Sequence, residues 1–352
     1  MQKLNEIASQ FALDGSIESI KPLGEGFIND TFIVRTAGDA PDYILQRKNK
    51  NVFPDVPGMM QNIAKVTGHI RRRVEAEAGD VLREVLTVVP AKNGELYYED
   101  EDGEYWAVSL FIDGTIAYDR ADTPALAFKG GEGIGKFQAQ LADFREPLSE
   151  TIKGFHDIRH RFSQWDASVK ADAAGRVKDL AEEICAVESR RERMLCFKKL
   201  VEEGVIPPRV THNDTKISNI LFDKEGNVLC VIDLDTVMLS TSLYDFGDAI
   251  RSYANSGDED DRDLGRVSLS MPMFEAYADA RRTAHPERNR QSRILSALYH
   301  LRAGTSLPYG LYRRRQILQN QVSRAQSCAY MRTAASAREH GGAVSGHVRD
   351  CE

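Results

Sequence analysis

Residues 210–222 read Val-Thr-His-Asn-Asp-Thr-Lys-Ile-Ser-Asn-Ile-Leu-Phe, and residues 231–235 read Val-Ile-Asp-Leu-Asp. A carboxylate, Asp214, precedes the amide of Asn219 by five residues, and a second carboxylate, Asp233, ends the next apolar segment. The turn residues 223–227 join the two apolar segments, so we predict a hairpin. A carboxylate on a loop with an amide close by, and another carboxylate on the partner strand, is the arrangement that phosphoryl transfer assisted by Mg²⁺ requires.

We therefore predict that Asp214 orients the acceptor hydroxyl and accepts its proton, while Asn219 and Asp233 hold Mg²⁺ between the phosphates of ATP. The structural alternative is a hairpin with polar turn residues. It accounts for residues 223–227 but not for the polar residues that flank the strands. Asp235 is either a further metal ligand or a hydrogen-bond anchor, and we favour the ligand.

A glycine-containing turn near the N-terminus is a candidate nucleotide-binding loop. Gly24, Gly26 and Asn29 lie between two short apolar segments. Glycines there let backbone N–H groups approach phosphates, whereas in isolation they are more often a plain hairpin turn. The downstream Asp214 motif favours the nucleotide-binding interpretation.

The third predicted strand should supply a Lys to the phosphates, but Gln46 stands at that place. Strand alternation puts Gln46 and Lys48 on one face and Arg47 on the other. We assign Gln46 to the nucleotide site and keep Arg47 and Lys48 as candidates for the phosphate-contacting charge. Phe111 and Ile112 enter the site from a short hinge.

The chain resembles the aminoglycoside phosphotransferase and choline kinase superfamily, which shares the protein-kinase fold. Within it, the chain looks like the N-acetylhexosamine 1-kinases. The stretches that carry the resemblance are 24–29, 43–47, 156–162 (His-Asp-Ile-Arg-His-Arg-Phe), 209–216, 232–236 and 244–251. The resemblance implies that Asp214 is the base, that Asn219 and Asp233 bind Mg²⁺, and that ATP phosphorylates the anomeric hydroxyl of a sugar.

We expect an α+β, bilobal, protein-kinase-like fold with an N-lobe over 1–111 and a helical C-lobe over 112–284. The apolar patterns predict an N-terminal helix around residues 4–11, then strands at 17–23, 30–36, 42–47, 83–89 and 104–111 and a helix over 59–77. Helical patterns follow at 123–144, 169–187, 189–203, 243–254 and 266–282, interrupted by a β-rich stretch at 209–235.

Composition excludes several classes of protein. The formal charge of −7 over 352 residues disfavours a nucleic-acid binder. No apolar run approaches the ~18 residues of a membrane span, and the N-terminus lacks a secretory signal. The five cysteines contain no C-x-x-C pair and indicate reduced thiols, so we expect a cytoplasmic protein.

Three further motifs have competing interpretations. Gly130 to Phe137 nearly matches a phosphate-binding P-loop, but Phe137 replaces the hydroxyl residue and we predict a helix. His156 and His160 have the spacing of metal ligands, yet without a third ligand nearby we favour packing or sugar contact.

For Asp245 we favour a structural role, with hydrogen bonds that brace the Asp214 loop, over a direct part in the chemistry.

The C-terminal part, 285–352, departs from the family pattern. From Arg281 to Glu352 there are thirteen Arg, no Lys and four acidic residues. We hypothesise a shifted reading frame, which resequencing tests; the alternative is a divergent Arg-rich tail.

Two other functions compete with a sugar 1-kinase. One is a kinase for an amino alcohol or aminoglycoside, and the other is a catalytically impaired nucleotide-binding relative.

Overall fold

The computed structural model describes residues 2–24, 28–255 and 269–284. These residues form two compact units that alternate along the chain. The first takes residues up to Tyr118, Lys136–Lys153 and Ser218–Leu239, and the second takes Asp119–Gly135, Gly154–Ile217 and the chain from Ser240 on. Residues 218–239 therefore group with the N-terminal sheet, whereas the sequence prediction had one boundary at residue 111.

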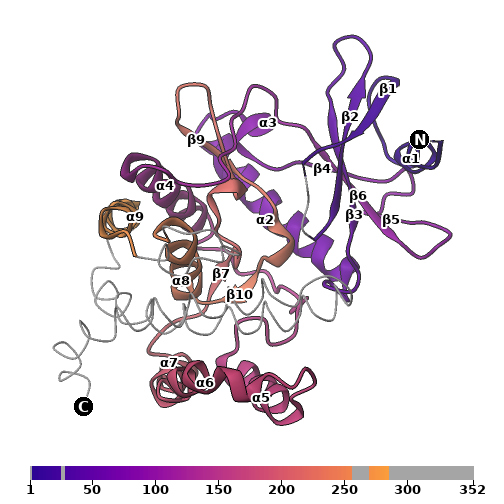
Figure 1. Ribbon diagram of the computed structural model, residues 1–352. Coiled ribbons are helices and arrows are strands. Elements are labelled where there is room, and N and C mark those ends of the chain that lie inside the picture. Colours follow the sequence, from indigo (N-terminus) through magenta and orange to yellow (C-terminus); the bar gives the residue numbers. More distant parts are fainter. Residues whose placement is uncertain (1, 25–27, 256–268, 285–352) are drawn as a thin grey trace. The chain divides into compact units, whose positions relative to one another are not determined.

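The first unit is built on an antiparallel sheet (Figure 1). Its strands are β1 (Ile17–Pro22), β2 (Asp30–Thr36), β3 (Tyr43–Lys48), β4 (Val88–Val89), β5 (Tyr98–Glu99) and β6 (Tyr105–Leu110). The order is β1-β2-β3-β6-β4, and β5 pairs with β6. Helix α1 (Gln2–Ala8) lies beside β1 and buries Ile7 and Ala8 against one face of this sheet.

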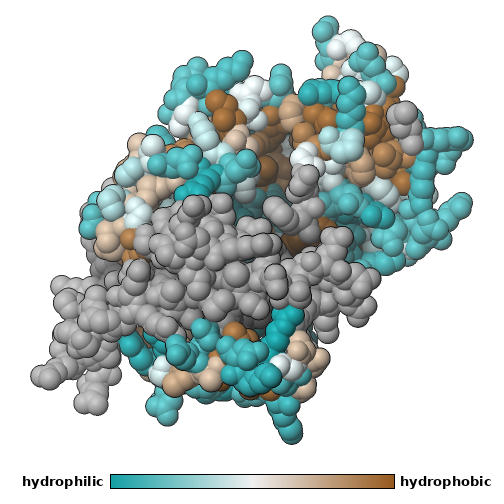
Figure 2. Space-filling view, viewed as in Figure 1, coloured by the Kyte–Doolittle hydropathy of each residue, from teal (hydrophilic) through white to brown (hydrophobic). Residues whose placement is uncertain are grey.

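Strand alternation places different kinds of residues on the two faces of the sheet. Tyr43 and Leu45 of β3 belong to the hydrophobic core under α1, so Gln46 and Lys48 lie on the opposite face. Figure 2 shows hydrophobic residues gathered over β1 and β2 and hydrophilic residues along the edge near β5. The face that carries Lys48 is therefore available for tasks other than packing against α1.

Helix α2 (Val56–Ala76) supports the second half of the first unit. The Asp55 side chain caps it by accepting from the N–H of Gly58, and Pro57 lies in its first turn. Its buried stripe includes Met59, Ile63, Val66 and Ile70. Within this stripe lies a polar residue, Asn62, whose amide bonds the carbonyl oxygens of Ser149 at 2.8 Å and Val237 at 3.1 Å.

One predicted strand was wrong. Residues 83–89 begin as helix α3 (Val81–Glu84), and the strand is limited to β4. The Asp80 carboxylate caps α3 by accepting from the N–H of Leu82 at 3.1 Å. A capping aspartate satisfies a backbone donor of the first turn, so the local signal for a helix start outweighs the apolar pattern.

The hairpin predicted from the opening motif is present. Strands β8 (Ile220–Phe222) and β9 (Val228–Val231) pair antiparallel, with Ile220 opposite Val231. Short 3₁₀ turns precede and follow them: η2 (Ile217–Asn219) and η3 (Leu234–Thr236). Strand β10 is Met238–Ser240.

The second unit is mainly helical. Its helices are α5 (Ile158–Ala171), α6 (Ala181–Glu188), α7 (Arg191–Glu202), α8 (Ser242–Tyr253) and α9 (Met271–Ala284), with the short helix η1 (Val177–Leu180) and strand β7 (Arg209–Thr211). Figure 1 shows α5, α6 and α7 grouped together, and they share the core of Phe162, Val187 and Met194. The sequence prediction missed α5, which begins at the Asp157 cap.

Helix α4 (Pro124–Gln140) contains the glycine-rich segment that resembles a P-loop. A Cβ on Gly130 would lie 2.1 Å from the Tyr253 ring, and one on Gly131 would lie 2.7 Å from the Tyr277 carbonyl oxygen. These glycines let α8 and α9 approach the helix closely. The prediction of a helix is confirmed, and Lys136 bonds Glu84 at 2.8 Å.

Among the described helices, none is both long and apolar enough to cross a bilayer. The Arg-rich segment 285–352, on which the reading-frame hypothesis rests, lies outside the described residues.

Candidate functional site

The loop that carries Asp214 is held by two buried carboxylates of α8. The Asp245 carboxylate accepts from the backbone N–H of His212 at 3.2 Å and of Asn213 at 2.8 Å. Asp248 accepts from the N–H of Thr215 at 2.8 Å. Backbone donors on both sides of Asp214 are therefore fixed, and the bracing role predicted for Asp245 is confirmed.

Side chains of the loop add to this support. The Thr215 hydroxyl donates to the Asp245 carbonyl oxygen at 2.8 Å, and the Thr211 hydroxyl donates to the Asn213 side-chain oxygen at 3.0 Å. Asn213 has a φ of +67°, in the left-handed region. Asn tolerates this region better than most residues, so the sequence fits the sharp turn just before Asp214.

Asp214 itself is partly exposed, with 24% of its side chain accessible. Its carboxylate lies 3.4 Å from the ammonium group of Lys216, which sequence reasoning did not single out. The signal that could have found it is its position two residues after the base, within the same loop. A cation there opposes the charge of the carboxylate and suits an anionic phosphate.

His156 supports the same loop from another side. Its Nε2 lies 3.2 Å from the carbonyl oxygen of Asn213. A carbonyl only accepts, so this nitrogen carries the proton. The ring also packs against Phe155 and Tyr244, with centroid separations of 4.2 and 5.3 Å. This packing agrees with the interpretation of His156 as a supporting residue.

In the first unit, the β8–β9 hairpin brings Asn219 and Asp233 to the same end. Asn219 directly precedes β8, and its carbonyl oxygen accepts from the N–H of Ile232 at 2.9 Å, one residue before Asp233. Asp233 has φ and ψ of +59° and +55°, a conformation that is uncommon outside glycine and recurs at functional sites. Amide and carboxylate oxygens are donors that Mg²⁺ prefers, so the pair fits this ion.

Asp235 differs from Asp233 because its carboxylate is already engaged. Its side chain is 5% exposed, and its two oxygens lie 2.8 and 2.9 Å from the Lys48 ammonium group. The Asn29 amide donates to the same carboxylate at 2.7 Å. A carboxylate has about four lone-pair positions, and three of them are used. The sequence analysis favoured a metal ligand at Asp235, whereas this geometry favours the hydrogen-bond anchor.

The nucleotide-binding residues predicted from sequence have distinct surroundings. Gln46 donates to the Thr31 hydroxyl at 3.2 Å and accepts from Lys48 at 2.7 Å. The Asn29 side-chain oxygen accepts from the N–H of Asn49 at 3.1 Å. Gly24 has a φ of +67° with open space where a Cβ would lie, and Gly26 lies outside the described residues.

The hinge residues follow β6. The N–H of Phe111 donates to the carbonyl oxygen of Asp42 at 2.9 Å, and the Arg35 guanidinium lies 5.2 Å from the centre of its ring. Ile112 is buried, and its carbonyl oxygen accepts from the Thr115 hydroxyl at 2.9 Å. Their contact with nucleotide remains a prediction.

Comparison with known proteins gives this geometry its context. The model of the phosphotransferase enzyme family matches residues 19–281. The match spans most of the chain, so the chain belongs to this family.

Solved structures of kinases share the fold. An aminopropanol kinase associated with a microcompartment is 18% identical, with a TM-score of 0.60 over 97% of this chain and 98% of that one. An aminoglycoside phosphotransferase from Alicyclobacillus acidocaldarius is 12% identical, with a TM-score of 0.53 over 97% and 94%. The choline kinase of Streptococcus pneumoniae is 13% identical, with a TM-score of 0.51 over 92% and 94%. These likenesses confirm the α+β, protein-kinase-like fold.

Proposed function

We propose that this chain transfers the γ-phosphoryl group of ATP to the anomeric hydroxyl of a sugar, an N-acetylhexosamine, with Mg²⁺ as cofactor. The observation that carries the phosphotransferase part is the bracing of the Asp214 loop by Asp245 and Asp248. Buried carboxylates of α8 accept from three backbone N–H groups and so fix a loop whose own carboxylate, Asp214, is partly exposed. A fixed and accessible carboxylate is what a general base requires.

In the proposed reaction, Asp214 orients the acceptor hydroxyl and accepts its proton as the sugar oxygen bonds to the γ-phosphorus. The bond from this phosphorus to the bridging oxygen breaks, and ADP leaves. Lys216, 3.4 Å from Asp214, offsets negative charge near the transferred group. Asn219 and Asp233 would hold Mg²⁺, which neutralises charge that develops on the phosphates.

The sugar acceptor rests on residues 156–162, the stretch that resembles the hexosamine 1-kinases. His156 bonds the carbonyl of Asn213, the residue just before the proposed base. At least His156 of this stretch therefore helps to support the Asp214 loop. An anomeric hydroxyl also suits a carboxylate base, because it is more acidic than an ordinary alcohol.

An acceptor panel tests the proposal. We expect ADP formation with N-acetylglucosamine or N-acetylgalactosamine, and little with choline, aminopropanol or kanamycin. In the methyl glycoside of the preferred sugar the anomeric hydroxyl is blocked, so turnover should be abolished. The 6-deoxy analogue of the free sugar keeps this hydroxyl and should remain a substrate.

Two measurements on the product identify phosphorylation at C1. A reducing-sugar assay should show that the reducing end is lost, and a ³¹P NMR spectrum should show an anomeric phosphate. Turnover with the methyl glycoside would refute the anomeric position. Turnover only with choline or aminopropanol would favour an amino-alcohol kinase, which the fold likeness to such kinases keeps as the second candidate.

A further inference from the structure

A buried polar cluster in the first unit has a composition that packing does not explain. The Lys48 side chain is 4% exposed and contacts Asp235 at 2.8 Å and Gln46 at 2.7 Å. Asn29 completes the cluster through its bond to Asp235. The cluster thus connects three segments: Asn29 lies just after the glycine turn, Lys48 ends β3, and Asp235 lies in the turn that follows Asp233.

Burial of such a pair is costly. Two charges lose their hydration, and their attraction in the protein interior often only offsets this loss. Apolar residues of similar volume frequently give equal or greater stability. A buried Lys–Asp pair next to a candidate metal ligand therefore points to a task beyond stability.

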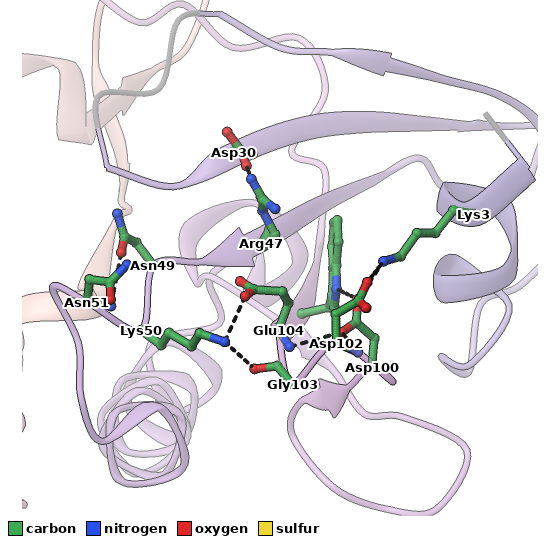
Figure 3. Close-up of polar contacts among 11 residues, drawn as sticks. Lys3, Asp30, Arg47, Asn49, Lys50, Asn51, Asp100, Asp102, Gly103 and Glu104 are labelled. Atoms are coloured by element: carbon green, nitrogen blue, oxygen red, sulfur yellow. Dashed lines mark hydrogen bonds and ion pairs between the residues drawn. The ribbon is translucent and has the colours of Figure 1, made fainter. Parts of the chain in front are cut away.

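The neighbouring basic residues have other partners. Arg47 donates to Asp30 on β2 at 2.7 Å, with 43% of its side chain exposed. Lys50 bonds Glu104 at 2.7 Å and the Gly103 carbonyl oxygen at 2.9 Å. Both side chains are partly exposed, and Figure 3 shows them directed toward these partners. Of the three basic residues from 47 to 50, Lys48 is the one that lies on the face of Gln46.

We propose that Lys48 supplies the fixed cation for the nucleotide phosphates, from a position two residues beyond Gln46, and that Asp235 is its positioning residue rather than a metal ligand. Residues two apart on a strand share a face, so the longer Lys side chain serves the region that Gln46 borders. A phosphate oxygen replaces the neutral Gln46 oxygen at the ammonium group, because an anion is the stronger acceptor. The bond to Asp235 persists and holds the ammonium group in place.

This inference rests on the proposed nucleotide-dependent function, and four variants test it. Lys48→Met removes the charge at similar volume, Asp235→Asn weakens its anchor, and the double variant removes both charges of the pair. Arg47→Met is the matched control, since it lies on the same strand but on the opposite face. Calorimetry with ADP in MgCl₂ and with adenosine separates the contribution of the phosphates from that of the base.

We expect Lys48→Met to weaken ADP binding by roughly 10–100-fold, the value of a charge-assisted hydrogen bond, and to leave adenosine binding within about twofold. Asp235→Asn should weaken ADP binding less. The double variant should recover the melting temperature that Lys48→Met loses, because no unpaired buried charge remains, but it should not recover ADP affinity.

Arg47→Met should bind both ligands like the unmodified chain. If the double variant has both the melting temperature and the ADP affinity of the unmodified chain, the inference is overturned and the pair is purely structural. If the unmodified chain binds neither ADP nor adenosine, the proposed function itself fails, and this result is distinct from a selective effect of Lys48→Met.

Discussion

The Asp214 loop and the β8–β9 hairpin place their carboxylates in opposite ways. In the loop, Asp245 and Asp248 accept from backbone N–H groups and leave Asp214 accessible. At the hairpin, Asp235 is engaged by the side chains of Lys48 and Asn29, beside the exposed Asp233. In each region a buried carboxylate holds other groups in place, and a more accessible one is the residue that we propose for chemistry. Burial and hydrogen-bond partners, not residue type, thus distinguish the carboxylates that position other groups from those that we propose for catalysis and metal binding.

The largest expected effect comes from Asp214. Asp214→Asn removes the proposed base at constant shape, and turnover should fall by roughly 10²–10⁴-fold, the contribution of general base catalysis. Affinity for ADP should stay close to that of the unmodified chain. Steady-state kinetics and calorimetry check both quantities. Near-normal turnover would show that Asp214 does not act as the base.

Asp233→Asn should act on metal dependence instead. Half-maximal activity should need at least roughly 10–100-fold more Mg²⁺, because the loss of even an outer-shell partner of a metal ligand costs that much affinity. Asp223→Asn, in the exposed turn of the same hairpin, is the control and should leave the Mg²⁺ titration unchanged. An unchanged titration for Asp233→Asn would remove this residue from the metal site.

Asp245→Asn tests whether the loop depends on its brace. An amide keeps one neutral oxygen, so both backbone donors lose their charged partner and one of them faces an NH₂ group instead of an acceptor. We expect stability to fall by about 1–3 kcal/mol and turnover to fall with it. Denaturant unfolding measures the first effect. Unaltered stability and turnover would contradict the contrast between the two regions.

A smaller effect is expected at the Asp157 cap of α5, next to His156. Asp157 accepts from the N–H groups of Arg159 and His160. Burial alone would raise its pKa, but the Lys198 ammonium and these backbone donors outweigh burial and hold the pKa below its ordinary value. Asp157→Ala should cost about 1 kcal/mol at neutral pH.

The pH dependence of this cap has a definite direction. The depressed pKa means that the charged form contributes stability above the ordinary pKa of Asp, and that this contribution is lost as the pH falls through the depressed pKa. Asp157→Asn keeps a capping oxygen but cannot titrate. The variant should retain part of the stability that the cap contributes, but this contribution should no longer depend on pH. The free energy of unfolding at pH 7 and pH 3 measures both. Equal acid dependence in both proteins would refute this assignment.

The smallest effect is expected at Lys136. The P-loop alternative requires this residue for activity, whereas in the structure it forms a partly exposed ion pair with Glu84. Lys136→Ala should leave turnover within about twofold and change stability by no more than ~1 kcal/mol. A loss of activity comparable to that of Asp214→Asn would restore the P-loop interpretation.

Several features could be predicted because their signals are local. Alternation and turn residues predicted β1 to β3 within one or two residues, and the polar residues around 223–227 predicted the β8–β9 hairpin. The sequence prediction missed two helices that begin at an aspartate cap: α3 after Asp80, where a strand was predicted, and α5 after Asp157. A cap changes the conformation of the following turn without altering the apolar pattern on which the prediction relied.

The sequence by itself indicated the fold class through its resemblance to a kinase superfamily. It also indicated the candidate chemistry, because Asp214, Asn219 and Asp233 lie within twenty residues and their spacing is a local property of one loop and one hairpin. Only the tertiary structure decided which cation meets Asp235. Asn29 and Lys48 are 206 and 187 residues away from it in the chain. Such contacts depend on how the β3 strand and the hairpin pack within the first unit, and no local pattern records that packing.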